Sequence, residues 1–190
     1  MKFCSQCGNT VEQKVPEADN RLRFVCVSCD IIHYQNPNIV SGTLPVYGDK
    51  ILLCKRAIEP RYGYWTLPAG FMENKETTSE AAIRETWEEA EAIVEIGKLF
   101  SMISVPQVDQ VHIFFLARLL EPKYAAGSES LEVELFSEDE IPWEDIAFPT
   151  VKKTLKLFFA DREKGDFGTH VTEIIRSPRN LVPKEHNEHN

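Results

Sequence analysis

The chain has 190 residues, of which 43% are hydrophobic and 27% charged, a composition typical of one globular domain or of a medium domain with a small appendage. Its 30 acidic and 21 basic side chains give a formal net charge of −9, which argues against nucleic acid as a partner. There is no apolar run long enough to span a membrane and no signal-like start, so we expect a cytoplasmic protein without membrane contact.

Four of the five cysteines form two pairs near the N-terminus. Cys4 and Cys7 are separated by two residues, and Cys26 and Cys29 repeat this spacing after eighteen residues. Two such pairs are typical ligands of a zinc ribbon, in which four thiolates close the coordination of a structural Zn²⁺. The alternatives are two disulfides, which a cytoplasmic chain disfavours, or a redox pair, which needs no second copy. We therefore expect a zinc ribbon over residues 1–37.

The rest of the chain alternates between predicted strands and helices. Strands are expected at 39–47, 50–56, 93–105, 111–120 and 131–137, with an aromatic, Pro- and Gly-rich loop at 58–75 and an acidic loop at 121–130. Helices are expected at about 77–91 and 149–163. This order favours an α/β fold in which helices cover both faces of a mixed sheet. We assign this domain to residues 38–165 and a C-terminal tail to 166–190.

The first of these helices concentrates negative charge on one side. Glu85, Glu88 and Glu89 fall within an arc of about 100° on a helical wheel. The opposite side, which is expected to pack, carries Ile83, Trp87 and Ala90. Like charges at this spacing repel by a few tenths of a kcal/mol per pair. The arc is therefore either a solvated surface or a carboxylate site for a hard divalent cation such as Mg²⁺.

The wider pattern decides between these alternatives. Six residues stand at the spacing Gly-x5-Glu-x7-Arg-Glu-x2-Glu-Glu: Gly70, Glu76, Arg84, Glu85, Glu88 and Glu89. This pattern resembles the Nudix box, and the resemblance covers about residues 38–165. Thr86 and Ala92 replace aliphatic residues of the box, and Glu91 replaces its glycine. Because that glycine usually ends the helix with positive φ, we expect at Glu91 either a strained helix end or a longer helix.

The resemblance implies an α/β/α sandwich, preceded here by the zinc ribbon, that hydrolyses a nucleoside diphosphate linked to another group and uses Mg²⁺ or Mn²⁺. The implied metal ligands, carried over by position, are Glu85, Glu88, Glu89 and the backbone carbonyl of Ala69. Arg84 is expected to act in catalysis by holding a glutamate in place, with Gly70 and Glu76 supporting the metal ligands.

The general base is expected in the acidic loop. Glu129 aligns best with a loop glutamate of zinc-ribbon relatives, and Glu132 is the runner-up. In some Nudix enzymes a glutamate of the box takes this part, which keeps Glu88 among the catalytic candidates. Weaker candidates for substrate contact, through phosphate or by stacking, are Arg56, Arg61, Phe71 and Tyr34. Each of these four is also consistent with an ordinary surface or packing role.

The resemblance to zinc-ribbon members implies FAD or ADP-ribose as substrate, ahead of NADH, with AMP and a second monophosphate as products. NADH pyrophosphatases carry Ser-Gln-Pro-Trp-Pro-Phe-Pro-x-Ser after the box, which residues 101–109 match only sparsely. Relatives also imply a homodimer. Two other functions stay open, a Nudix ligand sensor that does not hydrolyse and a zinc ribbon that binds nucleic acid. The intact box glutamates disfavour the first, and the absence of a basic patch in residues 1–37 disfavours the second.

Overall fold

The computed structural model describes residues 1–175, and the chain divides into two compact units, Met1–Pro37 and Asn38–Asn190. The first unit is a small antiparallel sheet in the order β1-β2-β3. Its strands are β1 (Val11–Lys14), β2 (Arg23–Cys26) and β3 (Ile32–His33). Both cysteine pairs lie on turns, because the Gly8 N–H donates to the Cys4 carbonyl and the Cys26 N–H to the Ile31 carbonyl, each at 3.0 Å.

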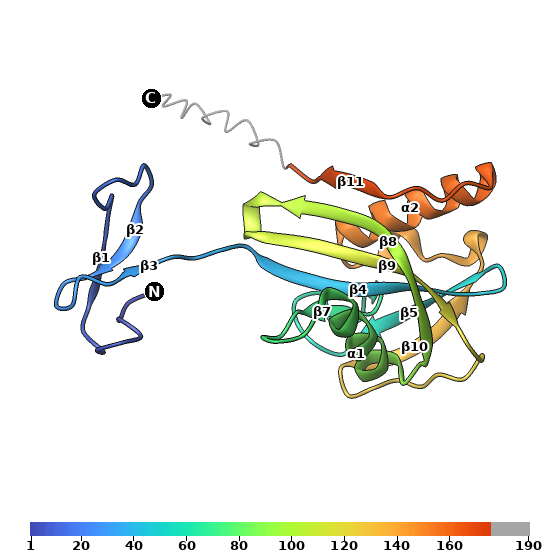
Figure 1. The fold of residues 1–190 in the computed structure, drawn as a ribbon. Coiled ribbons are helices and arrows are strands. Elements are labelled where there is room, and N and C mark those ends of the chain that lie inside the picture. Colours follow the sequence, from blue (N-terminus) through green and yellow to red (C-terminus); the bar gives the residue numbers. More distant parts are fainter. Residues whose placement is uncertain (176–190) are drawn as a thin grey trace, which may run out of the picture. The chain divides into compact units, whose positions relative to one another are not determined.

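The second unit is built on a mixed sheet (Figure 1). Its strands are β4 (Asn38–Tyr47), β5 (Lys50–Arg56), β6 (Trp65–Thr66), β7 (Ala69–Phe71), β8 (Val94–Val105), β9 (Gln110–Leu119), β10 (Ser130–Phe136) and β11 (His170–Glu173). The main order is β10-β5-β4-β9-β8-β11, while β6 pairs with β5 and β7 with β4. The pairs β4–β9 and β8–β11 are parallel and the others antiparallel.

Two α-helices, α1 (Thr78–Ala90) and α2 (Pro149–Lys164), cover opposite faces of this sheet (Figure 1). Short 3₁₀ turns are η1 (Pro106–Val108), η2 (Glu138–Glu140) and η3 (Trp143–Asp145). The side chains of β5 contribute to both faces of the sheet, since alternate side chains of a strand point to opposite sides. Ile51 and Leu53 join a buried cluster with Leu155 of α2, whereas Leu52 and Cys54 join another with Ala90 of α1. The predicted α/β/α sandwich is confirmed.

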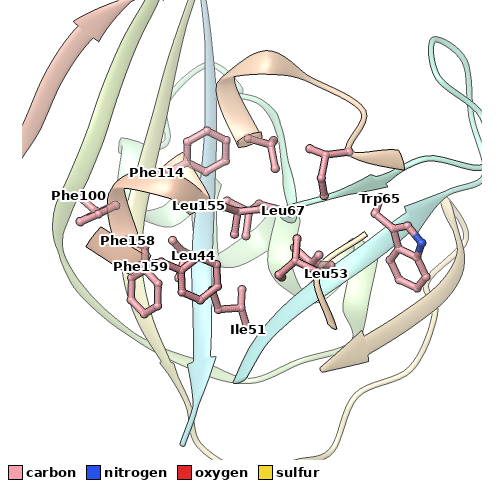
Figure 2. Close-up of a cluster of buried hydrophobic side chains, with 13 residues drawn as sticks. Leu44, Ile51, Leu53, Trp65, Leu67, Phe100, Phe114, Leu155, Phe158 and Phe159 are labelled. Atoms are coloured by element: carbon pink, nitrogen blue, oxygen red, sulfur yellow. The ribbon is translucent and has the colours of Figure 1, made fainter. Parts of the chain in front are cut away.

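The larger cluster holds α2 against the sheet, and Figure 2 shows its side chains. Phe100 and Phe158 meet edge to face with ring centroids 6.2 Å apart, and Leu155 is fully buried in the same cluster. Each such side chain stabilises the fold by about 1.5–3 kcal/mol through burial. The α2 face is therefore filled with core residues.

Helix α1 begins and ends with defined caps. The Thr77 hydroxyl accepts from the Glu80 N–H at 3.2 Å while the Glu80 carboxylate accepts from the Thr77 N–H at 2.7 Å, which forms a capping box. At the other end Glu91 is left-handed, with φ 46° and ψ 30°, and its N–H donates to the Trp87 carbonyl. Of the two expected consequences of Glu91, the strained helix end is the one observed.

The predicted packing side of α1 is confirmed for Ala90, which is fully buried, and wrong for Ile83 and Trp87. Ile83 and Trp87 are 40% and 52% exposed, whereas Thr86 is fully buried and Glu89 only 5% exposed. Thr86 packs because its hydroxyl lies 2.6 Å from that of Thr43 on β4 and donates to the Ala82 carbonyl. The acidic arc and the buried side of the helix therefore overlap at Glu89 instead of opposing each other.

Two segment assignments also need correction. The loop at 58–75 contains β6 and β7, which are too short to show a periodic pattern. The tail assigned to 166–190 begins too early, because β11 pairs in parallel with β8 and the His170 ring lies 2.7 Å from the Asp161 carboxylate of α2. The rest of that tail, residues 176–190, lies outside the described residues. Among residues 1–175 the helices are too short or too polar to cross a membrane.

Candidate active site

Arg84 lies at the centre of the candidate site. Its guanidinium donates twice to the Glu76 carboxylate, from Nε at 3.1 Å and from Nη2 at 2.7 Å. Nη1 donates to Glu85 at 2.7 Å and to Glu88 at 3.0 Å, and Nη2 also donates to the Phe71 carbonyl at 3.2 Å. A planar guanidinium suits such paired contacts. One side chain thus links the loop before α1 to two carboxylates of the helix.

Glu76 anchors this arrangement from the N-terminal side. Its carboxylate accepts the Glu73 N–H at 2.5 Å in addition to the paired contact from Arg84. These donors, with Arg84 first, lower the pKa of Glu76 and keep it ionised. Glu76 therefore fixes the orientation of Arg84.

Two glycines allow close approach at the site, one between β7 and a helix carboxylate and the other between β4 and the segment that leads into β7. Gly70 on β7 lies so close to Glu85 that a Cβ there would be 2.3 Å from its carboxylate carbon. A Cβ on Gly42 of β4 would be 2.3 Å from the Cβ of Ala69 and from the Pro68 carbonyl oxygen. Gly42 is not among the residues predicted from the sequence, although a glycine inside a predicted strand is a signal of such a close approach.

Glu89 is the most buried carboxylate of the site, at 5% exposure. Burial, then the negative charges of Glu85 and Glu129, raises the pKa of Glu89 to about 8 against the opposing effects of the Ala69 N–H, which donates to it at 3.1 Å, and of Arg56. Burial likewise raises the pKa of Glu85. The site thus brings together carboxylates whose negative charge is not fully balanced by positive groups nearby.

The acidic loop docks on the C-terminal end of α1. The Ala125 N–H donates to the Ala90 carbonyl at 2.9 Å and the Gly127 N–H to the Glu89 carbonyl at 3.1 Å. The Glu129 carbonyl accepts from the Ala57 N–H at 2.8 Å, after the end of β5. This docking brings the charge of Glu129 within electrostatic reach of the helix carboxylates. The runner-up, Glu132, instead accepts from Lys55 at 2.8 Å.

The four candidates for substrate contact occupy different environments. Arg56 is 8% exposed, donates from Nε to the Pro60 carbonyl at 2.9 Å and lies over the Phe148 ring. Arg61 is exposed beside the Tyr64 ring. The Phe71 side chain is 54% exposed, although its carbonyl binds Arg84. Tyr34 belongs to the first unit, where Arg23 lies over its ring.

The donors around α1 suit a hard divalent cation. Glu85, Glu88 and Glu89 supply carboxylate oxygens, the chemistry that Mg²⁺ and Mn²⁺ prefer, and burial at Glu89 favours a nearby cation. In this structure Arg84 binds two of these three carboxylates, Glu85 and Glu88. Within residues 1–175, the four cysteines are the one set of three or more ligand side chains whose ligand atoms all lie within 4.8 Å of one another.

Those cysteines have the geometry of a zinc site. Cys7 Sγ lies 3.4 Å from Cys26 Sγ and 3.5 Å from Cys29 Sγ, and Cys4 Sγ lies 3.8 Å from Cys29 Sγ. A tetrahedral site with Zn–S bonds of about 2.3 Å places its sulfurs about 3.8 Å apart. His33 Nε2 lies 3.3 Å from Cys4 Sγ, as a supporting hydrogen bond to a ligand would. The four thiols therefore fit Zn²⁺.

Comparison with known families agrees with both units. Residues 2–35 match the family described as Nudix N-terminal, a zinc ribbon, and residues 37–158 match the NUDIX domain. A Nudix hydrolase structure from Nitrosomonas europaea is 50% identical, with a TM-score of 0.90, and the match covers 93% of this chain and all of that one.

Two curated relatives are more distant. The ADP-ribose pyrophosphatase of Methanocaldococcus jannaschii is 32% identical over 113 residues, which cover 57% of this chain and 67% of the relative. The NAD-capped RNA hydrolase NudC of Haemophilus influenzae strain PittGG is 29% identical over 178 residues, 85% of this chain and 63% of the relative. Other Haemophilus influenzae NudC proteins match over 93 residues, a third of their own length. The family match over 37–158, together with the site geometry, shows that this chain belongs to the Nudix hydrolase family and carries the zinc ribbon of the family in front of the hydrolase domain.

Proposed function

We propose that the protein is a Mg²⁺- or Mn²⁺-dependent pyrophosphatase that cleaves ADP-ribose, or a related nucleoside diphosphate joined to a second group, into AMP and a second monophosphate. The observation that carries this proposal is Glu89, a carboxylate that is 5% exposed and lies near the charges of Glu85 and Glu129. Burying such a group is costly unless a cation offsets its charge. A divalent cation that also binds a pyrophosphate supplies that charge.

The proposed ligands of the cations are Glu85, Glu88, Glu89 and the Ala69 carbonyl. Bound there, the cations would spread the charge of the pyrophosphate and lower the pKa of a bound water. Arg84 orients Glu85 and Glu88 through its contacts at 2.7 and 3.0 Å, and Glu76 holds Arg84 in turn. Gly70 lets β7 approach the Glu85 carboxylate closely.

Glu129 is the proposed general base, which takes a proton from the attacking water. It is exposed, so that substrate and water can reach it, and its backbone is held by the Ala57 N–H. The ion pair of Glu132 with Lys55 supports Glu129 over the runner-up, because the Glu132 carboxylate is already bound by an ammonium group. Glu88, 55% exposed and bound to Arg84, is assigned to metal binding first.

Arg56 is the proposed phosphate contact. It is 8% exposed, and its charge is felt by Glu89, so a guanidinium lies beside the acidic site. Arg61 and Phe71 are exposed and could contact the outer parts of the substrate. A contact from Tyr34 stays a prediction that the structure does not test.

The names of the relatives support ADP-ribose as the first substrate to try, since the archaeal relative is an ADP-ribose pyrophosphatase. An NAD-type substrate is the second candidate, because the NudC relative of strain PittGG aligns with 85% of the chain. We therefore rank NAD-type substrates ahead of FAD as candidates, because FAD appears in the name of neither relative. The match to NudC also makes an NAD-capped RNA a substrate to test, despite the net charge of −9.

A substrate panel tests the proposal. The protein is incubated with ADP-ribose, NADH, FAD and an NAD-capped oligoribonucleotide in Mg²⁺ or Mn²⁺, and the products are separated by chromatography. We expect AMP and ribose 5-phosphate from ADP-ribose, a loss of turnover in Glu89→Gln, and unchanged turnover in Glu91→Gln, whose carboxylate is exposed. Binding without product in wild type would instead support a sensor, and turnover of the capped oligoribonucleotide alone would support RNA decapping.

We further propose that the protein is cytoplasmic and forms a homodimer. A cytoplasmic location suits four free thiols gathered at zinc-ligand distances, since a reducing compartment keeps them available for zinc. A homodimer is implied by the family resemblance, and light scattering on purified protein would test it.

A further inference from the structure

The C-terminal end of α1 receives hydrogen bonds from the acidic loop. The last carbonyls of an α-helix have no partner inside the helix and need donors from elsewhere. Here the Ala90 and Glu89 carbonyls accept from the Ala125 and Gly127 N–H groups, at 2.9 and 3.1 Å. The loop therefore completes the end of the helix that carries the proposed metal ligands.

Gly127 is the point of closest approach between loop and helix. A Cβ on Gly127 would lie 1.8 Å from the Glu88 carbonyl oxygen, 2.8 Å from the Glu88 carbonyl carbon and 3.3 Å from that of Glu89. All three are backbone atoms of α1, which side-chain rotation cannot move. Any larger residue must lift the loop off the helix by more than about 1 Å, since Cβ contacts under 3.0 Å are essentially never seen.

Glu129 follows Gly127 by two residues and is tied to it. The Ser130 N–H donates to the Gly127 carbonyl at 3.1 Å, so residues 127–130 form a tight turn around Glu129. The Glu129 carbonyl is held by the Ala57 N–H at 2.8 Å. The main chain around Glu129 is thus fixed at two points, one on α1 and one after β5.

We infer that Gly127 is a positioning residue: its close contact with the Glu88 and Glu89 backbone sets the distance between Glu129 and the carboxylates of the same helix residues. Glu88 and Glu89 then have two tasks. Their side chains are proposed metal ligands, while the Glu89 carbonyl accepts the Gly127 N–H and the Glu88 carbonyl is the backbone group that Gly127 approaches most closely. This inference rests on the proposed function, in which Glu129 takes a proton from water.

A double-mutant cycle tests whether Gly127 acts through Glu129. Gly127→Ala, Glu129→Gln and the double variant are assayed with the substrate that the panel identifies. We expect Gly127→Ala to lower kcat by about 100-fold, the effect of a displacement of about 1 Å, with KM changed less than about threefold. In the Glu129→Gln background the same substitution should cost less than about threefold, because the base that it displaces is already gone.

The control is Gly168→Ala, since a Cβ at Gly168 has no atom within 4 Å and we expect wild-type kcat. The inference would be overturned if the losses in kcat of the two single variants multiplied in the double variant. Wild-type kcat in Gly127→Ala would also overturn it. Complete loss of turnover in Gly127→Ala together with normal turnover in Glu129→Gln would also overturn the inference. It would not contradict the proposed metal-dependent hydrolysis, because wild type would still turn over the substrate.

Hydrogen exchange gives a readout that does not need turnover. The Ala125 amide is bonded to α1 in wild type, so we expect it to be protected there and to exchange at least tenfold faster in Gly127→Ala. Equal protection in both proteins would contradict the inference even if no substrate were found. Absence of turnover in wild type with the expected exchange difference would reject the proposed function and leave the docking role of Gly127 supported.

Discussion

Gly70 and Glu85 are in direct contact, one on β7 and the other on α1. A Cβ on Gly70 would lie 2.3 Å from the carboxylate carbon of Glu85 and 2.3 and 2.4 Å from its oxygens. The Oε1 atom of this carboxylate also accepts from the Arg84 Nη1 at 2.7 Å. Glu85 is therefore held by a guanidinium and by the close approach of a backbone without a side chain, which together fix its direction.

Gly70→Ala should displace Glu85 and weaken the metal site. We expect kcat to fall by about 100-fold and the Mg²⁺ concentration for half-maximal rate to rise, because the carboxylate must move by about 1 Å to reach ordinary van der Waals contact. Steady-state rates over a Mg²⁺ titration measure both effects. Gly168→Ala is again the control, and an unchanged Mg²⁺ requirement in Gly70→Ala would reject Glu85 as a ligand.

The Thr43–Thr86 hydrogen bond replaces an aliphatic contact under α1. Thr86→Val should lower the free energy of unfolding by about 1–3 kcal/mol, because it leaves the buried Thr43 hydroxyl without its partner. Thr43→Val should lower it less, because the Thr86 hydroxyl keeps its bond to the Ala82 carbonyl. The double variant should be less destabilised than the sum of the two, since both hydroxyls are then replaced. Urea unfolding followed by tryptophan fluorescence measures this, as all three tryptophans lie in the second unit. Additive losses would show that the hydroxyls do not interact.

Glu91 holds a left-handed conformation that glycine adopts without strain. Glu91→Gly should therefore raise the free energy of unfolding by about 0.5–1 kcal/mol, and Glu91→Ala, which keeps a Cβ, should not. The same fluorescence-monitored unfolding compares them. Equal stability of the glycine and alanine variants would show that φ at this position carries no strain.

His112 makes the stability of the second unit depend on pH. Burial lowers the pKa of His112 to about 4, and its ring nitrogens lie 3.0 Å from the Thr150 hydroxyl and 2.9 Å from the Gln110 amide oxygen. Below pH 6.5 the unfolded chain binds a proton that the folded one does not, so stability should fall as the pH drops from 6.5 towards 4. Between pH 7 and 5 we expect wild type to lose about 2 kcal/mol more than His112→Gln. Parallel curves for the two proteins would contradict a neutral buried His112.

Zinc should be bound by the first unit alone. We expect one Zn²⁺ per chain, a loss of most bound zinc in Cys26→Ser, and full zinc content in Cys54→Ala, because Cys54 is buried in the second unit and is not one of the four clustered cysteines. A colorimetric zinc assay after unfolding measures the content. Zinc retained in Cys26→Ser would point to another set of ligands.

Much of the site could be predicted because its parts are close in sequence. Arg84, Glu85, Glu88 and Glu89 lie within two turns of one helix, and helical geometry places such residues on neighbouring positions of its surface. The two cysteine pairs could be recognised from the sequence for the same reason, since a two-residue spacing on a turn points both thiols at one ion. The larger elements followed from periodicity, whereas β6 and β7 were missed because two or three residues show none.

What the sequence by itself determined is the set of chemical groups: the carboxylates on α1, the arginine between them and the four thiols. Only the tertiary structure decided that Glu89 is buried while Trp87 is exposed, that Gly42 and Gly70 admit close approach, and that Gly127 seats the acidic loop on α1. A helical wheel gives angles between side chains but not which of them faces the sheet. That choice depends on contacts between segments about forty residues apart, such as Thr43 with Thr86, whose fit is a matter of shape that no local pattern encodes.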